Sequence, residues 1–224
     1  MRLQWVCLAV VVCGGLGAAW FDGTPPSVAA DERAILSQAI VTLPALGAEP
    51  YTYVGSKKCK MCHMKLYKSW AKTEMGMAFK TLKPGEAKEA KEKHNVDVDK
   101  DYTRDAACVK CHTTGHGHDG GYVIPDPNDK KAVKAAKKRE GIGCESCHGP
   151  GSEYVKVFKD IFMSKRKYKV EELYAVGMRK IEESTCTTCH NAESPTIDAA
   201  TPFDFEKRKT EGIHEHQVLK QRDG

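Results

Sequence analysis

The apolar residues of this chain recur at three- and four-residue intervals, which is typical of short amphipathic helices. Between residues 64 and 79, Leu66, Tyr67 and Trp70 lie on one such face, and we expect a single helix there that ends before Pro84. No stretch alternates apolar and polar residues for long enough to predict a sheet. The pattern therefore predicts a mainly α chain with little strand.

Four more helices are expected from the same pattern. Residues 86–94 and 130–139 are rich in charge, and we expect both segments to lie on a solvated surface. Residues 153–162 and 170–183 have the apolar spacing of amphipathic helices. The connecting segments are polar or contain the glycine and proline residues that favour turns.

A short pattern of cysteine and histidine occurs four times between these helices. Each copy reads Cys-x-x-Cys-His, and the four copies are Cys59/Cys62/His63, Cys108/Cys111/His112, Cys144/Cys147/His148 and Cys186/Cys189/His190. This spacing is the signature of c-type haem attachment. The two thiols form thioethers with the two vinyl groups of one porphyrin, and the following histidine is the proximal ligand of the iron. We therefore expect four covalently bound haem c groups in a redox protein.

Zinc binding is the alternative role for paired cysteines. Two Cys-x-x-Cys pairs can form one tetrahedral thiolate site, so four pairs could form two. A zinc ribbon does not need a histidine directly after each second cysteine. A thioredoxin-like motif would be expected once, beside a βαβ pattern that the sequence lacks. The repeated histidine therefore favours haem.

The composition changes the expected core. Hydrophobic residues are 41% of the 224 residues and charged residues are 29%, which leaves a thin apolar core for this length. Buried porphyrins would provide the missing apolar area, which is worth about 25 cal/mol per Å². We therefore expect a multihaem c-type cytochrome fold whose core is formed by four closely packed haems. We also expect that the apoprotein does not fold stably.

The N-terminal residues predict export to the periplasm. Arg2 precedes an apolar run with the features of a signal peptide, and Gly17-Ala-Ala19 is a candidate cleavage site. The run is also just long enough to span a bilayer, so an uncleaved segment would tether the protein to a membrane. We expect three parts: a signal peptide or membrane anchor (1–21), a linker (22–50) and a tetrahaem cytochrome c domain (51–224).

The net charge of +5 gives no support to nucleic-acid binding. Such binding needs a concentrated basic stripe, and the propionates of the expected haems bring the charge of the holoprotein nearer to neutral. Lysine-rich stretches over residues 83–93, 130–139 and 156–169 could instead steer an acidic redox partner. A solvated surface is the ordinary alternative for each stretch.

From Val54 onward the chain resembles the cytochrome c-554 family, the tetrahaem electron carriers associated with hydroxylamine oxidation in ammonia-oxidising bacteria. The matching segments occur in the family's order: Ser69-Trp70, Asp101-Tyr-Thr103, Gly120-Gly-Tyr122, Gly143-Cys-Glu-Ser-Cys-His-Gly-Pro-Gly151, Thr201-Pro-Phe203 and His214-Glu-His216. The resemblance implies haems in stacked pairs, through which electrons hop. It also implies three irons with two axial ligands and a second iron with only one.

The same resemblance implies second ligands for the irons. The distal ligand of the fourth haem corresponds to His214. The distal position of the third haem holds Met75 in this chain, and Met/His ligation raises the reduction potential. The distal histidine of the first haem has no counterpart, because counting along the chain reaches Phe158, and Met163 is the nearby thioether.

The second haem has an open distal face near Thr201 if the resemblance holds. His116 stands where the family has an aromatic residue. This histidine either closes a haem or belongs to a polar, glycine-rich surface loop. We expect His94, on a charged helix, to be solvated.

These features favour a periplasmic electron carrier over an enzyme. The expected donor is an oxidoreductase, for example one of nitrogen metabolism, and the expected acceptor is quinone-linked at the membrane or another cytochrome. The alternative is an enzyme that acts on nitric oxide or hydroxylamine at a five-coordinate haem. A third reading is a conductor that the linker tethers to a membrane.

Overall fold

The structure is a computed structural model, and it describes residues 50–197 and 202–223. The contacts within the chain divide it into Met1–Ala48 and Glu49–Gly224, and the elements below belong to the second unit. The expected signal segment, the linker as far as residue 49, and Thr201 lie outside the described residues. The predictions made for them therefore stay predictions.

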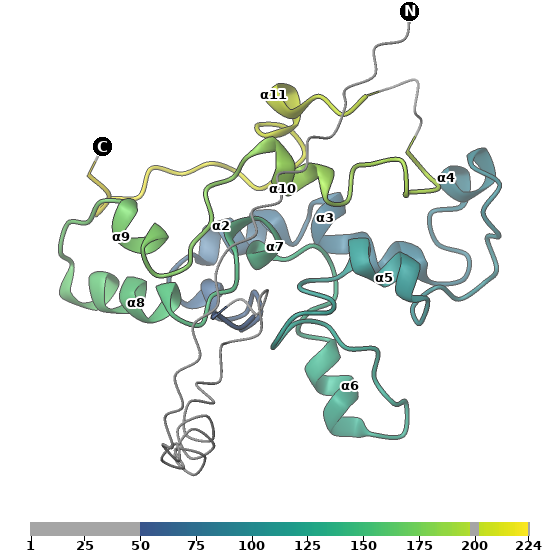
Figure 1. The fold of residues 1–224 in the computed structure, drawn as a ribbon, viewed down its shortest axis with the longest axis horizontal. Coiled ribbons are helices and arrows are strands. Elements are labelled where there is room, and N and C mark those ends of the chain that lie inside the picture. The colour runs from purple at the N-terminus through teal and green to yellow at the C-terminus, as the bar shows by residue number, and fades with distance from the viewer. Residues whose placement is uncertain (1–49, 198–201, 224) are drawn as a thin grey trace, which may run out of the picture. The chain divides into compact units, whose positions relative to one another are not determined.

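Short helices provide the regular secondary structure of the described residues, as Figure 1 shows. In chain order they are η1 (Cys59–Met61), α2 (Met64–Trp70), α3 (Glu74–Met77), η2 (Ala78–Leu82), α4 (Lys88–Lys93), α5 (Ala106–His112), α6 (Lys130–Ala136), α7 (Cys144–His148), α8 (Tyr154–Ser164), α9 (Glu171–Tyr174), α10 (Glu183–Thr187) and α11 (Phe205–Arg208). In this part of the chain β pairing is limited to two isolated bridges, and none of the helices combines the length and hydropathy of a membrane span. The predicted mainly α class is confirmed.

The single helix predicted over residues 64–79 is wrong, because α2 ends at Trp70 and α3 begins at Glu74. Thr73 lies between them. Its hydroxyl donates to the Trp70 carbonyl at 2.7 Å and accepts from the Gly76 N–H at 3.1 Å. These bonds make Thr73 the N-cap of a new helix, which apolar periodicity does not reveal.

The helix predicted over residues 170–183 is also shorter in the structure. Only α9 and the first residue of α10 are helical there, and Gly177 lies between them with a φ of +95°. A Cβ atom at Gly177 would lie 2.5 Å from the ring of Tyr51. Both the left-handed backbone and this close approach favour glycine, so the chain turns at this position.

The charged segment over residues 86–94 is helical only in α4, and its expected solvation is wrong for Lys91. This lysine is 6% exposed, and its Nζ donates to the Lys83 carbonyl at 2.9 Å. The ammonium group therefore provides hydrogen bonds to backbone carbonyls of the chain before the second motif. The helices predicted over 130–139 and 153–162 are confirmed as α6 and α8.

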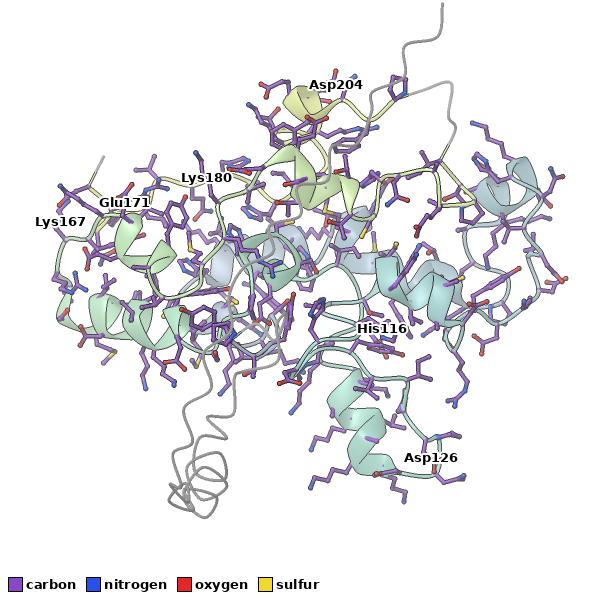
Figure 2. The ribbon with its side chains drawn as sticks, viewed as in Figure 1. His116, Asp126, Lys167, Glu171, Lys180 and Asp204 are labelled. Atoms are coloured by element: carbon purple, nitrogen blue, oxygen red, sulfur yellow. The ribbon has the colours of Figure 1, made fainter. Side chains whose placement is uncertain are left out.

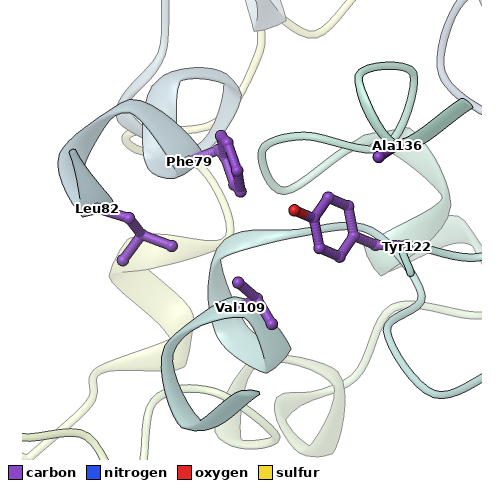
Figure 3. Packing of buried hydrophobic residues seen from close by; sticks show 5 residues of the cluster. All are labelled: Phe79, Leu82, Val109, Tyr122 and Ala136. Carbon is purple, nitrogen blue, oxygen red and sulfur yellow. The ribbon is translucent and has the colours of Figure 1, made fainter. Parts of the chain in front are cut away.

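Buried apolar side chains form two small clusters. The first cluster, shown in Figure 3, packs η2 and α5 against the chain near α6, and consists of Phe79, Leu82, Val109, Tyr122 and Ala136. The second cluster joins α8 and α9, which lie side by side in Figure 1, and consists of Tyr154, Ile161, Tyr168 and Leu173. Each cluster is local, and neither reaches all four motifs.

The buried carboxylate of Glu145 connects segments that are far apart in the sequence. Its side chain is fully buried, and its two oxygens accept hydrogen bonds from the N–H groups of Val54 at 2.8 Å, Gly55 at 2.6 Å and Gly151 at 2.7 Å. Hydrogen bonds to a charged acceptor are stronger than neutral ones. Glu145 therefore fastens the extended segment before the first motif to the third motif.

We expect Glu145→Gln to lower the free energy of unfolding of the holoprotein by about 3 kcal/mol. The substitution removes the charge and directs an NH₂ group at backbone N–H donors. Guanidinium denaturation followed by circular dichroism measures the change. The matched control is Glu153→Gln, because Glu153 makes only an exposed pair with Lys156 at 2.7 Å. The control should change stability by less than about 0.5 kcal/mol. Equal effects of the two variants would contradict the role of Glu145.

Candidate haem-attachment sites

The first motif begins on η1 and ends at the start of α2. Cys59 opens η1, and Cys62 follows its last residue. The N–H of His63 donates to the Cys59 carbonyl at 2.9 Å, so one tight turn brings the two thiols and the imidazole together. Both cysteines are half-buried.

The second motif lies at the end of α5, which begins after Asp105 caps the Ala107 N–H. His112 Nδ1 lies 2.7 Å from the Ala78 carbonyl and 3.2 Å from the Thr81 hydroxyl. A carbonyl oxygen can only accept, so Nδ1 carries the proton and Nε2 keeps a free lone pair. A histidine that ligates a metal typically has this second-shell partner.

The third and fourth motifs form two further short helices. Helix α7 holds both Cys144 and Cys147 and ends at His148, which is half-buried. Helix α10 holds Cys186, and Cys189 and His190 follow it. The N–H of His190 donates to the Cys186 carbonyl at 2.9 Å, the same bond that closes the first motif. All four motifs therefore place their two cysteines and their histidine on one helical turn.

The thiols of different motifs lie close to one another. A hydrogen bond joins Cys59 of the first motif to Cys144 of the third. This bond, with burial, raises the pKa of Cys59, and it lowers the pKa of Cys144 to about 7. Cys189 of the fourth motif shares a hydrogen bond with Cys111 of the second. Burial is the largest cause that raises the pKa of Cys189 to about 12, and the neighbouring Cys111 adds to the shift.

The two pairs of motifs also lie close together, because α7 contacts α10. Burial raises the pKa of Cys147 to about 11, and the nearby Cys186 adds to the shift. The motifs therefore form a continuous series in the order first, third, fourth, second. All eight cysteines are free of disulfides.

Three of the motif histidines are held as neutral imidazoles. Burial is the main cause that lowers the pKa of His148 to about 4, and repulsion from His214 and His63 adds to the shift. Burial also lowers the pKa of His63, and repulsion from His214 adds to the shift. Burial lowers the pKa of His190, and repulsion from the Arg208 guanidinium adds to the shift. The neutral imidazole is the form that binds a metal ion.

His214, expected to ligate an iron, lies against the third motif. Its ring centroid is 6.4 Å from that of His148, and the two ring planes differ by 24°. The ring of His216 is 5.5 Å from that of His214. The fourth-motif His190, which the resemblance pairs with His214, stacks instead on Phe203 at 4.6 Å.

Met75 is half-buried on α3, beside the third motif. Its carbonyl accepts from the N–H of Ile142 at 2.9 Å, two residues before Cys144. Trp70 Nε1 donates to the carbonyl of the same Ile142 at 2.7 Å. The structure therefore places the backbone of Met75 beside the third motif, and its ligation of the iron stays a prediction.

The structure does not bring Met163 to the first motif. This side chain is 71% exposed near the end of α8, and the ring that lies next to His63 belongs to Phe158, with centroids 4.6 Å apart. His116 lies in the loop before α6 in Figure 2. Its Nδ1 donates to the Tyr122 carbonyl at 3.2 Å, which leaves its Nε2 available close to the second motif's core cluster.

Sequence reasoning missed three residues that shape these sites. Thr81 and Ala78 orient His112, but they precede it by more than 30 residues, and no local pattern marks them. The buried Glu145 lies inside the third motif, and its position between two cysteines gave no sign that it binds backbone N–H groups. Only the tertiary structure reveals these contacts.

These sites fit the group that the motifs predict. The described residues contain no cluster of three or more His, Cys, Asp or Glu side chains arranged to hold a metal ion, as a zinc site needs. Each motif instead offers two unpaired thiols on one helical turn and a histidine directly after them. The fold and the sites together define a mainly α multihaem c-type cytochrome.

Comparisons with known proteins agree with that class. The family model for "Cytochrome c554 and c-prime" matches residues 58–149. "Cytochrome c-554" of Nitrosomonas europaea is 35% identical over 188 residues, which is 75% of this chain and 77% of that protein. The solved reduced state of cytochrome c554 from Nitrosomonas europaea superposes with a TM-score of 0.67 and 33% identity, covering 78% of this chain and 90% of that one.

The chain belongs to the cytochrome c-554 family. It is therefore a c-type cytochrome that carries electrons, and it holds four covalently bound haem c groups.

Proposed function

We propose that this cytochrome works in the periplasm, after export, and carries electrons from a donor oxidoreductase to a membrane quinone-linked or cytochrome acceptor. A donor of nitrogen metabolism suits the family to which the chain belongs. If the N-terminal segment is uncleaved, the protein is tethered to the membrane. The observation that carries the proposal is the close packing of the motifs: α7 of the third motif contacts α10 of the fourth, and Glu145 of the third motif binds the backbone just before the first.

The residues of each motif have separate roles in the proposal. Haem iron, when bound, exchanges single electrons. The eight motif cysteines hold the porphyrins as thioethers, and the four motif histidines are the proximal ligands. The hydrogen bond from His112 Nδ1 to Ala78 keeps Nε2 free for the iron, and it fixes the orientation of the ring.

We assign Met75 to the third motif and His214 to the fourth as second ligands. The backbone contact between Met75 and Ile142 supports the first assignment. The ring contact between His214 and His148 defines the competing arrangement, in which His214 is the second ligand at the third motif. Thioether ligation gives a spectroscopic signature that imidazole ligation lacks, so the two arrangements can be distinguished.

We expect a near-infrared charge-transfer band from Met–iron ligation in the oxidised wild-type protein, and its loss in Met75→Leu. Met75→His should keep that iron low-spin and lower its reduction potential, because thioether ligation raises the potential. Met77→Leu is the control, because Met77 is 45% exposed on the same helix. If the wild type lacks the band, Met75 is not a ligand, and His214 takes its place at the third motif.

A lysine face on α2 supports docking of an acidic partner protein. Lys65 and Lys68 lie about one turn apart on α2, and Lys72 lies in the turn that follows its end. We call these three residues the lysine face. They line a surface depression of about 450 Å³ together with the C-terminal residues Glu215 and Gln217.

The lysine face is free of salt bridges and lies close to the first motif. None of its three lysines forms a salt bridge within the described residues, whereas several other lysines pair with carboxylates. Helix α2 begins directly after His63, and the N–H of Glu215 donates to the Ser69 hydroxyl at 2.8 Å. The face therefore lies beside the first motif and next to the segment that carries His214. This position suits the entry or exit of electrons.

We expect replacement of all three lysines of the lysine face by glutamate to slow electron transfer from photoreduced flavodoxin, an acidic donor protein, by about tenfold at low ionic strength. Stopped-flow absorbance of the haem bands measures the rate. The difference from wild type should disappear at high salt, because salt screens the attraction.

A matched control replaces Lys130, Lys131 and Lys134 on α6, which carries no haem motif. This control changes the net charge equally, and we expect its rate to stay within about twofold of wild type. Equal slowing in both variants would mean that net charge, not the lysine face, steers the partner.

A further inference from the structure

The carboxylate of Glu145 lies close to the attachment points of two motifs. Its residue directly follows Cys144 of the third motif, and its Oε2 accepts from the Gly55 N–H at 2.6 Å. The next residue, Ser56, is buried, and its hydroxyl accepts from the Cys144 N–H at 3.2 Å. The Ser56 carbonyl accepts from the N–H of Cys59, in the first motif, at 3.1 Å. One short segment therefore links this carboxylate to a cysteine of each motif.

The surroundings of the carboxylate are apolar apart from the backbone. A Cβ atom at Gly151 would lie 3.0 Å from Glu145 Oε1 and 3.1 Å from a methyl group of each of Val54 and Val155, so these side chains meet above the glycine. Within residues 50–197 and 202–223, no salt bridge involves Glu145. The N–H dipoles that bind it carry no net charge, so the site keeps one negative charge. Coulomb interactions of that charge are strong because little water screens them.

The charge of Glu145 acts on the sulfur atoms of both motifs. The hydrogen bond with Cys144, and then burial, raises the pKa of Cys59, and the Glu145 charge adds to the shift. The same charge opposes the hydrogen bond from Cys59 that lowers the pKa of Cys144. These two sulfur atoms are attachment points for the first and third porphyrins. A carboxylate that disfavours negative charge at these positions favours positive charge there.

We propose that the buried charge of Glu145 lowers the reduction potentials of two irons, those held by His63 and His148. Oxidised iron carries one more positive charge than reduced iron, so a nearby negative charge favours the oxidised form. This inference rests on the proposed function, in which these histidines are proximal ligands. At the third motif the effect opposes the one expected from a Met75 thioether, and separate variants measure the two effects.

The test is a potentiometric titration of the holoprotein, followed by haem absorbance. Glu145→Gln keeps the shape of the side chain and removes its charge. We expect two of the four midpoint potentials to rise, each by a roughly tenfold shift of the equilibrium toward reduced iron, which is about 59 mV for one electron. Glu145→Asp keeps the charge, so all four potentials should stay close to wild type. Glu153→Gln is the control, because it removes only a carboxylate that pairs with Lys156 at the surface, and it should change none of the four.

A variant that leaves Glu145 in place covers poor folding of Glu145→Gln. Val155→Lys brings a positive charge toward the carboxylate from a half-buried position on α8, and two potentials should again rise. Four unchanged potentials in both variants would overturn the inference. Equal rises in Glu145→Gln and Glu145→Asp would also overturn it, because side-chain geometry rather than charge would then set the potentials. A wild-type mass with fewer than four haems would instead overturn the proposed function.

Discussion

The covalent attachment of four porphyrins through paired cysteines is the constraint on which the rest of this structure depends. Each Cys-x-x-Cys-His unit occupies a single turn of a short helix, and helices of this length are unstable alone in water. The two clusters of buried side chains are local and hold neighbouring elements only. Rigid apolar groups tied to the chain at both thiols explain how such short helices keep a fixed arrangement. The neighbouring motifs would hold their porphyrins close together, which is the arrangement that transfer of electrons between haems requires.

Hydrogen bonds between residues far apart in the sequence hold the motifs together in addition to the haems. Glu145 lies between the cysteines of the third motif, yet its carboxylate binds the backbone before the first motif. Trp70 and Met75 connect the helices after the first motif to Ile142. These contacts act on the same pair of motifs whose thiols meet at Cys59 and Cys144. The first and third motifs are therefore joined by backbone and carboxylate hydrogen bonds, and a substitution that removes one of these bonds is expected to affect both sites.

Features that depend on local spacing were predicted correctly from the sequence. The four motifs, the mainly α class and the presence of α6 and α8 follow from short-range patterns, although α6 ends three residues earlier than predicted and α8 is shifted by one to two residues. The break at Thr73 and the burial of Lys91 did not, because each is decided by a hydrogen bond to a backbone group in the folded chain. The second axial ligands of the irons are harder still to predict from the sequence. His214 lies 66 positions beyond His148, and only tertiary structure brings their rings to 6.4 Å. Met163 was a reasonable thioether by position, but the helix turns it to solvent.

The most direct test of the porphyrins' role is the thermal unfolding, followed by far-ultraviolet circular dichroism, of a chain in which all eight motif cysteines are alanine. Without thioether attachment the chain should show little helix and no cooperative transition, whereas the holoprotein should unfold cooperatively. If the haem-free chain has the helix content of the holoprotein and unfolds in one sharp transition, side-chain packing organises the fold. That result would contradict a fold organised by its porphyrins.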